Sequence, residues 1–597
     1  MPATTTSQST TLPYDQYRRK VLGCWLGKAV GGTLGGPWEG HSGPLELSFY
    51  NPVPQEMLPN DDLDLQVVWL EAIRRHGLPV DRKLLADAWL EHVHMWPDEY
   101  GVACRNLTRG IMPPVSGSFD NGFTAGMGAA IRTELWACLA PGVPQLAAAL
   151  AYEDACVDHA GEGIHAATFL AVLQSMAFIS DDREALLDTA LASIPADSRV
   201  ARAIADTRTW WQESGNWQQI RAQILDKHGD HNFTDVAQNL AFTVLGWLAG
   251  TTFGERICIA VNCGKDTDCT GATLGALLGI LDPDAIEDRW LEPIGRDLVL
   301  SASMVGMHHP DNLETFTDHV AAAAVETLAY YHADMQLEAA PPLPALPAPR
   351  LQQAPCTLPG AILATNPLAV SLDYGNKVAF APDECRELTL HLQNLQSADI
   401  EGRMTITVPD NWKVKVQSDA TFALAPGART TCTLTITAPS AAAVRTYRNP
   451  LDIRITANGL DWTINGGLVQ TMPWLADGTT QLEAEGHYLQ LPAGPITLET
   501  EVKLPWPGMT YRFIAQAARS VILKLNGEVL VQHDGSHHVP AIHRAKDTAK
   551  DHRIGHAGWF RLTAELGDGE ACPFFICIGD GDNWNWIRNA EWRQILK

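Results

Sequence analysis

The chain has 597 residues, which is too long for one ordinary hydrophobic core, so roughly two to four domains are expected. Apolar residues make up 46% and charged residues 19% of the sequence, as in globular proteins with well-filled cores. The formal net charge of −26 argues against a nucleic acid as partner, because no basic run offsets it. A small anionic ligand stays compatible with this charge if a bound divalent metal ion reverses the local sign.

The first residues, Met1 to Thr11, are polar and lack the basic and apolar regions of a signal peptide. No later run is long and apolar enough to cross a membrane. The 12 cysteines include no Cys-x-x-Cys pair, which favours reduced thiols over a disulfide framework or a zinc site. We therefore expect a cytoplasmic protein with no membrane partner.

Helical periodicity dominates from Tyr14 to about Ala333 and predicts an all-α domain. The first helix, over residues 17–30, has glycines spaced four residues apart at Gly23, Gly27 and Gly31, so another backbone can approach it closely and it should be central. The glycine-rich run at 31–40, GGTLGGPWEG, is expected to break this helix into a loop that ends near Glu39. Residues 60–64, NDDLD, open another helix. Further helices are predicted at 84–94, 126–138, 146–156, 163–178, 185–192, 200–213, 217–228, 236–248, 273–281 and 321–332.

Composition changes at the Pro/Ala-rich stretch 339–349, which is typical of an extended connector between domains. Beyond it the apolar residues alternate with period two, which predicts strands. We expect a helical domain at 1–336, a linker at 337–359, an immunoglobulin-like sandwich at 360–472 and a second β-sandwich at 473–597. In the last domain, Asn526-Gly527 predicts a hairpin turn. Trp584, Trp586 and Trp592, near Asp580, Asp582 and Arg588, suggest either a glycan-binding surface or, more simply, core packing.

Two carboxylates stand two residues apart at Asp266 and Asp268, just before an apolar run that starts at Leu274. A helix N-terminus favours one acid as a cap, so capping is a sufficient explanation for the pair taken alone. Asp61 and Asp62 open a second helix in the same way. If the two N-termini converge, four carboxylates meet, and they cannot all stay ionised without a compensating charge. All-oxygen ligation would then select Mg²⁺ or Mn²⁺.

Three segments together resemble the signature segments of the ADP-ribosylglycohydrolase family across roughly residues 15–335. They are the run GGTLGGPWE at 31–39, NDD at 60–62 and GKDTDC at 264–269. Residues 128–132 and the pair Asp158-His159 resemble the substrate-cleft segments of that family. The resemblance implies an all-α orthogonal helical fold, two Mg²⁺ (or Mn²⁺) ions and hydrolysis at the anomeric carbon of a ribose.

The resemblance also implies roles for individual residues. Asp61, Asp62 and Asp268 would hold one ion, and Asp266 and Asp268 the other. Glu39, opposite them, would position or deprotonate the attacking water or gate the cleft, with Asp62 as the second catalytic residue. Arg132 and His159 are candidates for contact with the substrate or with the metal ligands, or else are structural. The remaining candidates are Trp38 for substrate contacts, and Asn60 and Cys269 for the metal.

Some positions depart from the family pattern. Asn60 stands where Thr or Ser is usual, and its amide oxygen can still bind a hard ion. Cys269 stands where Thr is usual, and because a thiol is a poor ligand for Mg²⁺, Thr267, Thr270 or a backbone carbonyl could replace it. Gly32 replaces a frequent Asp.

The leading hypothesis is a metal-dependent glycosyl hydrolase that acts on the N- or O-glycosidic bond of ADP-ribose or a related sugar, a small-molecule substrate. The appended β domains leave open an O-glycosidase that acts on a non-nucleotide carbohydrate or glycoconjugate, with a glycan bound to those domains. A protein of another class, which binds metal and ADP-ribose or sugar without turnover, is the third possibility.

Overall fold

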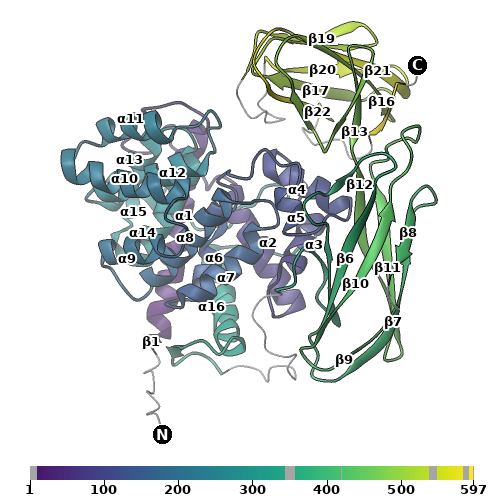
Figure 1. Ribbon diagram of the computed structural model, residues 1–597. Coiled ribbons are helices and arrows are strands. Elements are labelled where there is room, and N and C mark those ends of the chain that lie inside the picture. Colours follow the sequence, from purple (N-terminus) through teal and green to yellow (C-terminus); the bar gives the residue numbers. More distant parts are fainter. Residues whose placement is uncertain (1–9, 343–356, 418–419, 537–546, 582–589, 596–597) are drawn as a thin grey trace. The chain divides into compact units, whose positions relative to one another are not determined.

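The computed structural model describes residues 10–342, 357–417, 420–536, 547–581 and 590–595. The chain divides into two compact units (Figure 1). Unit 1 comprises Met1–His94 and Thr124–Pro355, and unit 2 comprises Met95–Phe123 and Cys356–Lys597. Unit 1 is almost entirely helical and unit 2 is mainly β-sheet, which confirms the predicted fold class of a helical domain followed by β-sandwiches.

Unit 1 is a helical bundle with one small parallel pair of strands, β1 (Thr10–Pro13) and β2 (Met335–Glu338). Its longer helices are α1 (Tyr14–Gly35), α2 (Asp61–His76), α3 (Arg82–His92), α7 (Pro144–Ala155), α8 (Glu162–Ala177), α9 (Arg183–Leu191), α10 (Arg199–Ser214), α11 (Trp217–His228), α12 (Val236–Ala249), α13 (Phe253–Asn262), α14 (Thr267–Leu281) and α16 (Leu313–Tyr330). Its short helical turns are η1 (Gly36–Trp38), η2 (Ala130–Arg132), α6 (Glu134–Leu139), η3 (Pro283–Ala285) and α15 (Asp288–Leu291).

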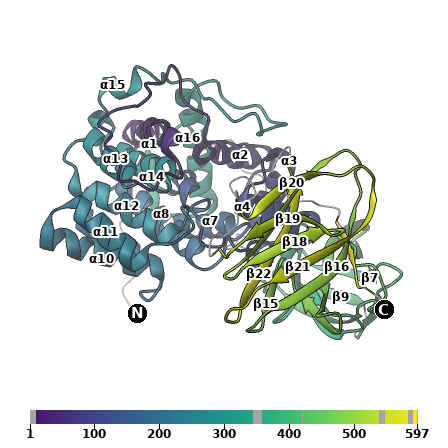
Figure 2. The ribbon, with the colours of Figure 1, turned by 90° about the horizontal axis from the view of Figure 1, so that it is seen from above.

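Helices α1 and α14 lie side by side at the centre of unit 1 (Figures 1 and 2). Their glycines face one another along the whole contact. A Cβ atom added to Gly27 would lie 2.0 Å from the carbonyl oxygen of Gly275, and one added to Gly31 would lie 2.0 Å from that of Gly271. The two backbones therefore touch directly, as the four-residue glycine spacing predicts, and side chains larger than hydrogen have no room there.

The structure corrects several predicted helix boundaries. The glycine run does not break the first helix at Gly31, because α1 continues to Gly35 before the turn η1. Packing against α14 there outweighs the low helix propensity of glycine. Helix α14 starts at Thr267, six residues before its predicted start at Thr273, and the helix predicted at 126–138 is reduced to η2 and α6. Helix α13 was not predicted, although Thr252 and Glu255 form a capping box before it.

Unit 2 contains two pairs of sheets. The first pair has strand orders β3-β4-β6-β10-β8 and β5-β12-β11-β7-β9, and the second has β14-β13-β16-β21-β18-β19, joined by β23, and β15-β22-β17-β20. The strands of the first pair are β3 (Ala361–Ala364), β4 (Leu368–Asp373), β5 (Ala379–Phe380), β6 (Cys385–Asn394), β7 (Ile400–Thr407), β8 (Lys413–Val416), β9 (Thr421–Leu424), β10 (Arg429–Thr437), β11 (Asn449–Ala457) and β12 (Leu460–Gln470). Those of the second are β13 (Met472–Ala476), β14 (Thr480–Ala484), β15 (Tyr488–Leu491), β16 (Ile496–Leu504), β17 (Thr510–Ala517), β18 (Val521–Leu525), β19 (Glu528–His533), β20 (Ala549–Arg553), β21 (Gly558–Leu566), β22 (Cys572–Asp580) and β23 (Glu591–Arg593).

The second pair of sheets shows where two features noted in the sequence lie. Strands β18 and β19 pair across Asn526-Gly527, both with positive φ, as the hairpin signal predicts. Trp592 is buried in the core of this part and contacts Trp474 at a ring distance of 6.4 Å, so it serves packing. Trp584, Trp586, Asp582 and Arg588 lie outside the described residues.

Unit 2 also includes two helices from the middle of the helical sequence, α4 (Asp98–Thr108) and α5 (Val115–Ser118). They are held there by buried charged groups. The Asp120 carboxylate accepts the backbone N–H of His487 at 2.7 Å and pairs with the Arg105 guanidinium at 2.9 Å. The His487 ring lies 2.6 Å from the same carboxylate. Burial alone would raise the pKa of Asp120, but the charge of Arg105 and the hydrogen bonds from His487 outweigh it and hold that pKa well below its usual range.

Among the described residues, no helix combines the length and the apolar character that crossing a membrane requires.

Candidate metal centre

The start of α2 shows which residue of the run 60–64 caps the helix and which acids do not. Asn60 is the N-cap, and its side-chain oxygen accepts the backbone N–H of Asp62 at 2.8 Å. Asp64 is buried and accepts the backbone N–H of Ser301 at 3.2 Å. The side-chain carboxylates of Asp61 and Asp62 are therefore not needed to cap the helix.

The N-terminus of α14 gives the same result for the Asp-x-Asp pair. Asp266 occupies the N-cap position but makes no side-chain capping hydrogen bond. Two nearby hydroxyls bond to the backbone instead, since Thr267 donates to the Gly35 carbonyl at 2.8 Å and Thr270 to the Thr267 carbonyl at 3.1 Å. The capping explanation for Asp266 and Asp268 thus does not account for their side chains.

The two helix starts converge on the last turn of α1, because a Cβ atom on Gly35 would lie 2.2 Å from the Thr267 carbonyl oxygen and one on Gly32 would lie 2.7 Å from Asn60 Nδ2. Two groups of possible ligand atoms result, each with all its atoms within 4.8 Å of one another: Asp62, Asp268 and Cys269 in one, and Glu39, Asp266 and Asp268 in the other. Asp268 belongs to both. Asp61, the first residue of α2, lies near enough for its charge to raise the pKa of Asp268.

Burial and the repulsion between like charges disfavour the ionised forms of the carboxyl groups in this cluster. Burial raises the pKa of Asp62 to about 7, with a further contribution from Asp61. The pKa values of Asp266 and Asp268 are raised well above the usual range, first by burial and then by the charge of Glu39. Burial and the neighbouring acids also raise the pKa of the Cys269 thiol. The carboxylates would be ionised together only with added positive charge.

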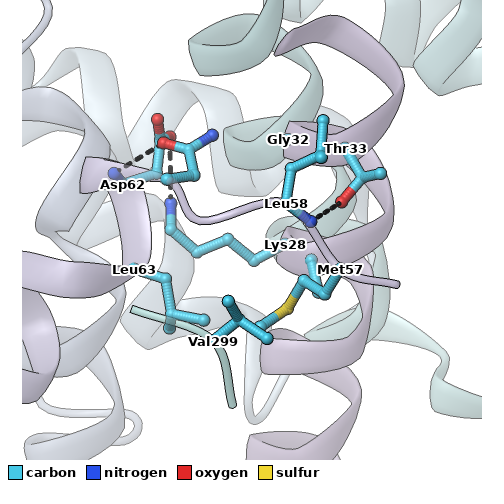
Figure 3. A pocket seen from close by; sticks show the side chains of 10 residues that line it. Lys28, Gly32, Thr33, Met57, Leu58, Asp62, Leu63 and Val299 are labelled. Atoms are coloured by element: carbon cyan, nitrogen blue, oxygen red, sulfur yellow. Dashed lines mark hydrogen bonds and ion pairs between the residues drawn. The ribbon is translucent and has the colours of Figure 1, made fainter. Parts of the chain in front are cut away.

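One cation of the chain itself, Lys28 of α1, lies behind Asp62 (Figure 3). Its ammonium group is 3.3 Å from Asp62 Oδ1 and 3.2 Å from Glu134 Oε2, and it donates to the Ile131 carbonyl at 2.7 Å. Burial alone would lower the pKa of Lys28, but the carboxylates of Glu134 and Asp62 raise it. Gln66 donates to Glu134 Oε2 at 3.0 Å, so this buried network is well satisfied.

The space on the Lys28 side of Asp62 is too small for a substrate. The cavity whose lining side chains Figure 3 shows leaves about 10 Å³ for the centre of a water-sized sphere, which is room for about one water molecule, and Met57, Leu63 and Val299 help to line it. Among the described residues, Asp62 Oδ2 has no hydrogen-bond partner, so this oxygen is available to a ligand.

The residues fit a pair of hard divalent ions. Buried carboxylate oxygens without a hydrogen-bond partner are present on Asp62 (Oδ2), Asp266 (Oδ2) and Asp268 (Oδ1), where buried polar atoms are normally paired. Oxygen donors and net negative charge are what Mg²⁺ and Mn²⁺ require. Cys269 is the exception, because a thiol that keeps its proton is not a ligand for such ions.

The residues predicted to contact substrate lie in different surroundings. Trp38 is partly exposed in η1, and its indole N–H donates to the Asn51 carbonyl at 3.0 Å. Arg132 is fully buried, with its guanidinium 2.9 Å from Asp154 and 2.6 Å from Asp158. His159 is also fully buried and lies 2.9 Å from Asp158. The described contacts of Arg132 and His159 are thus those of an internal ion-pair cluster.

Lys28, Glu134 and Gln66 were not predicted from the sequence. Lys28 offered a signal, because a lysine within the apolar, glycine-rich part of a helix needs a carboxylate partner when that part is buried. Glu134 and Gln66 offered none, since only the tertiary structure brings them to Lys28.

The helical domain thus carries a buried cluster of acids at the starts of two helices, with one carboxylate shared between two groups of possible ligand atoms. Residues 13–327, more than half of the chain, match the family model described as ADP-ribosylglycohydrolase. The chain therefore belongs to the ADP-ribosylglycohydrolase family. Residues 380–456 match the model described as the NPCBM-associated, NEW3 domain of alpha-galactosidase.

Solved structures show more distant similarities. An ADP-ribosylglycohydrolase-related protein complex shares 23% identity, covering 52% of this chain and 98% of that chain, with a TM-score of 0.38. An anti-sigma factor domain-containing protein from Clostridium clariflavum shares 8% identity over 34% of this chain and 81% of that chain (TM-score 0.15). An α-L-rhamnosidase from Aspergillus terreus shares 11% identity over 36% and 27%, respectively (TM-score 0.14). The comparison with curated proteins gave no match.

Proposed function

We propose that the chain is a divalent-metal-dependent glycosyl hydrolase that cleaves an N- or O-glycosidic bond at the anomeric carbon of ADP-ribose or a related sugar. The observation that carries this proposal is the sharing of Asp268 between two groups of buried ligand atoms. One carboxylate between two groups is the arrangement expected of a two-ion centre. Family membership gives the class of reaction.

In this proposal, Asp61, Asp62 and Asp268 hold one ion and Asp266 and Asp268 the other. Two Mg²⁺ or Mn²⁺ ions would supply positive charge for substrate oxygens and lower the pKa of a bound water molecule. Asn60 keeps α2 capped, and its amide oxygen has a second lone pair that could face an ion. Lys28 occupies Asp62 Oδ1, which leaves Oδ2 to face the site.

In this proposal, Glu39 orients the attacking water molecule and accepts its proton. Its carboxylate lies in the group with Asp266 and Asp268, and the residue is partly exposed, so water and a sugar can reach it. A carboxylate in that position can orient a water molecule and accept its proton as the glycosidic bond breaks. Trp38, next to Glu39 and also partly exposed, is placed to contact the substrate.

The metal centre is tested by replacing the shared carboxylate. We expect two divalent ions per wild-type chain by isothermal titration with Mn²⁺, and loss of both ions and of hydrolysis in Asp268→Asn. Asp64→Asn is the matched control, because this buried acid of the same region bonds to Ser301 and lies outside both groups. Absence of ions from the wild type after Mn²⁺ addition, or two ions in Asp268→Asn, would overturn the proposal.

A second candidate is an O-glycosidase that uses the same centre on a non-nucleotide carbohydrate. The match of residues 380–456 to a domain of alpha-galactosidase favours it. A panel of ADP-ribosyl-arginine, ADP-ribosyl-serine, O-acetyl-ADP-ribose and aryl glycosides separates the two. Release of free ADP-ribose supports the first candidate, and release of the aryl group supports the second. Binding of Mn²⁺ and ADP-ribose without turnover of any substrate would show a binding protein instead.

A further inference from the structure

We infer that Arg221 and Asn262 clamp the loop that carries Glu39 onto the loop that leads through Asp266 into α14, and so act as positioning residues for Glu39. The first loop, residues 39–47, follows η1, and the second, residues 263–266, joins α13, which ends at Asn262, to α14. The inference rests on the proposed function, since it assigns Glu39 a fixed position at the proposed centre. It favours a fixed Glu39 over the alternative in which Glu39 gates the cleft.

The backbones of the two loops are joined like short strands. The Gly40 N–H donates to the Lys265 carbonyl at 2.8 Å, and the Lys265 N–H donates to the His41 carbonyl at 2.6 Å. Gly43 and Gly264 make the closest approach, because a Cβ atom on Gly264 would lie 2.6 Å from the Gly43 nitrogen. Only glycine at both positions permits this contact, and both have positive φ.

Asn262 fastens the far end of the Glu39 loop with its side chain. Its Oδ1 accepts the backbone N–H of Leu47 at 2.7 Å, and its Nδ2 donates to the Leu47 carbonyl at 2.9 Å. Its own carbonyl accepts the N–H of Leu45 at 2.8 Å. The amide thus satisfies both backbone groups of one residue in a loop more than 200 positions away in the sequence.

The side chain of Arg221, on α11, donates hydrogen bonds to both loops. Its Nε donates to the Cys263 carbonyl at 2.7 Å, and its Nη2 donates to the Ser42 carbonyl. The side chain is 8% exposed, and burial lowers its pKa. No ion pair to a carboxylate is found for it among the described residues. A buried guanidinium that bonds to two loop carbonyls stabilises the arrangement of those loops, since its fork of donors fixes both at once.

The clamp determines where the Glu39 carboxylate lies. Glu39 stands three residues before Ser42 and one before Gly40, and both of these residues are bonded to the clamp or to the second loop. These bonds therefore lie close in the chain to the carboxylate that groups with Asp266 and Asp268. A shift of about 1 Å in a reacting group can lower a rate by about 100-fold. The structure thus makes Arg221 and Asn262 determinants of the rate without contact with the substrate.

The test uses hydrogen–deuterium exchange of the full chain in EDTA together with steady-state kinetics. In Arg221→Met we expect exchange at residues 39–47 to rise by at least about tenfold, because charged hydrogen bonds are lost. We expect kcat to fall by about 10- to 100-fold with little change in KM. Arg221→Lys should restore part of both, since one ammonium group cannot replace the fork. Lys227→Met, on the same helix but paired with Asp206, is the control and should match the wild type in these loops.

Unchanged exchange at residues 39–47 in Arg221→Met would overturn the inference, as would a uniform increase over all of unit 1. If Arg221→Met does not fold, Asn262→Ala is read in the same way, with the increase expected at Leu45 and Leu47. The exchange measurement needs neither metal nor substrate. If the wild type binds no Mn²⁺ and turns over no substrate, the proposed function fails, while the exchange result still decides whether the clamp exists.

Discussion

Substitution of Gly35 by alanine tests how the packing of α1 on α14 forms the metal centre. Gly35 has φ −82° and ψ −34°, and its neighbour Gly36 has φ −49° and ψ −43°, so both backbones are right-handed helical and accept alanine. Only the available space differs. A Cβ atom on Gly35 would lie 2.2 Å from the Thr267 carbonyl oxygen, whereas one on Gly36 would meet Leu58 Cδ1 at 3.7 Å. Gly36→Ala is therefore the matched control.

The size of the effect follows from that contact. A carbon and a carbonyl oxygen approach to about 3.3 Å at closest, so Gly35→Ala must separate the helices by about 1 Å. Overpacking of this kind costs about 1–3 kcal/mol, and the clash with backbone places it near 3. The higher helix propensity of alanine returns about 1 kcal/mol, which leaves a loss of about 2 kcal/mol, or, in a unit as large as unit 1, a Tm about 3 °C lower.

The same displacement should disrupt ion binding. Thr267 immediately precedes Asp268, and metal–oxygen distances are tolerated within about 0.2 Å, so a shift of about 1 Å exceeds what the centre can absorb. We expect Gly35→Ala to lose Mn²⁺ binding in isothermal titration and to melt early in calorimetry, while Gly36→Ala stays within about 1 °C of the wild type and binds normally. Equal Tm values and equal Mn²⁺ affinities in the two variants would refute the reasoning.

Two further outcomes follow from the charged groups. In EDTA, Asp266→Asn should melt at a higher temperature than the wild type, because burial and then the charge of Glu39 raise the pKa of Asp266. The rise in Tm that Mn²⁺ gives the wild type should be lost in this variant. A lower Tm than the wild type in EDTA would instead show that the carboxylate stabilises the fold. In unit 2, burial lowers the pKa of His487 below its unfolded value, so the unfolded chain binds a proton first and stability is lost as the pH falls below about 6.5. Melting curves between pH 7.5 and 5 should show a smaller loss for His487→Gln than for the wild type, and equal slopes would contradict this role.

The sequence determined the features that depend on local pattern. Period-two alternation gave the strands around Leu390 and Leu434, and the four-residue glycine spacing gave a buried first helix in contact with another backbone. These signals succeed because the side-chain period and the absence of a Cβ atom act within one element. The acid runs were visible for the same reason, but capping explained them equally well until Asn60 was seen to cap α2 and Asp266 was seen to make no capping bond.

Only the tertiary structure decided which groups meet. It carried α1 through the glycine run to Gly35, because contact with α14 outweighs glycine's low helix propensity. It paired Lys28 with Asp62, and it buried Arg132 in an ion pair with Asp158. It also brought Arg221 to two loops whose residues lie 42 and 179 positions away in the sequence. Contacts of such separation leave no periodic trace in a single sequence, because each depends on the packing of elements that are distant along the chain.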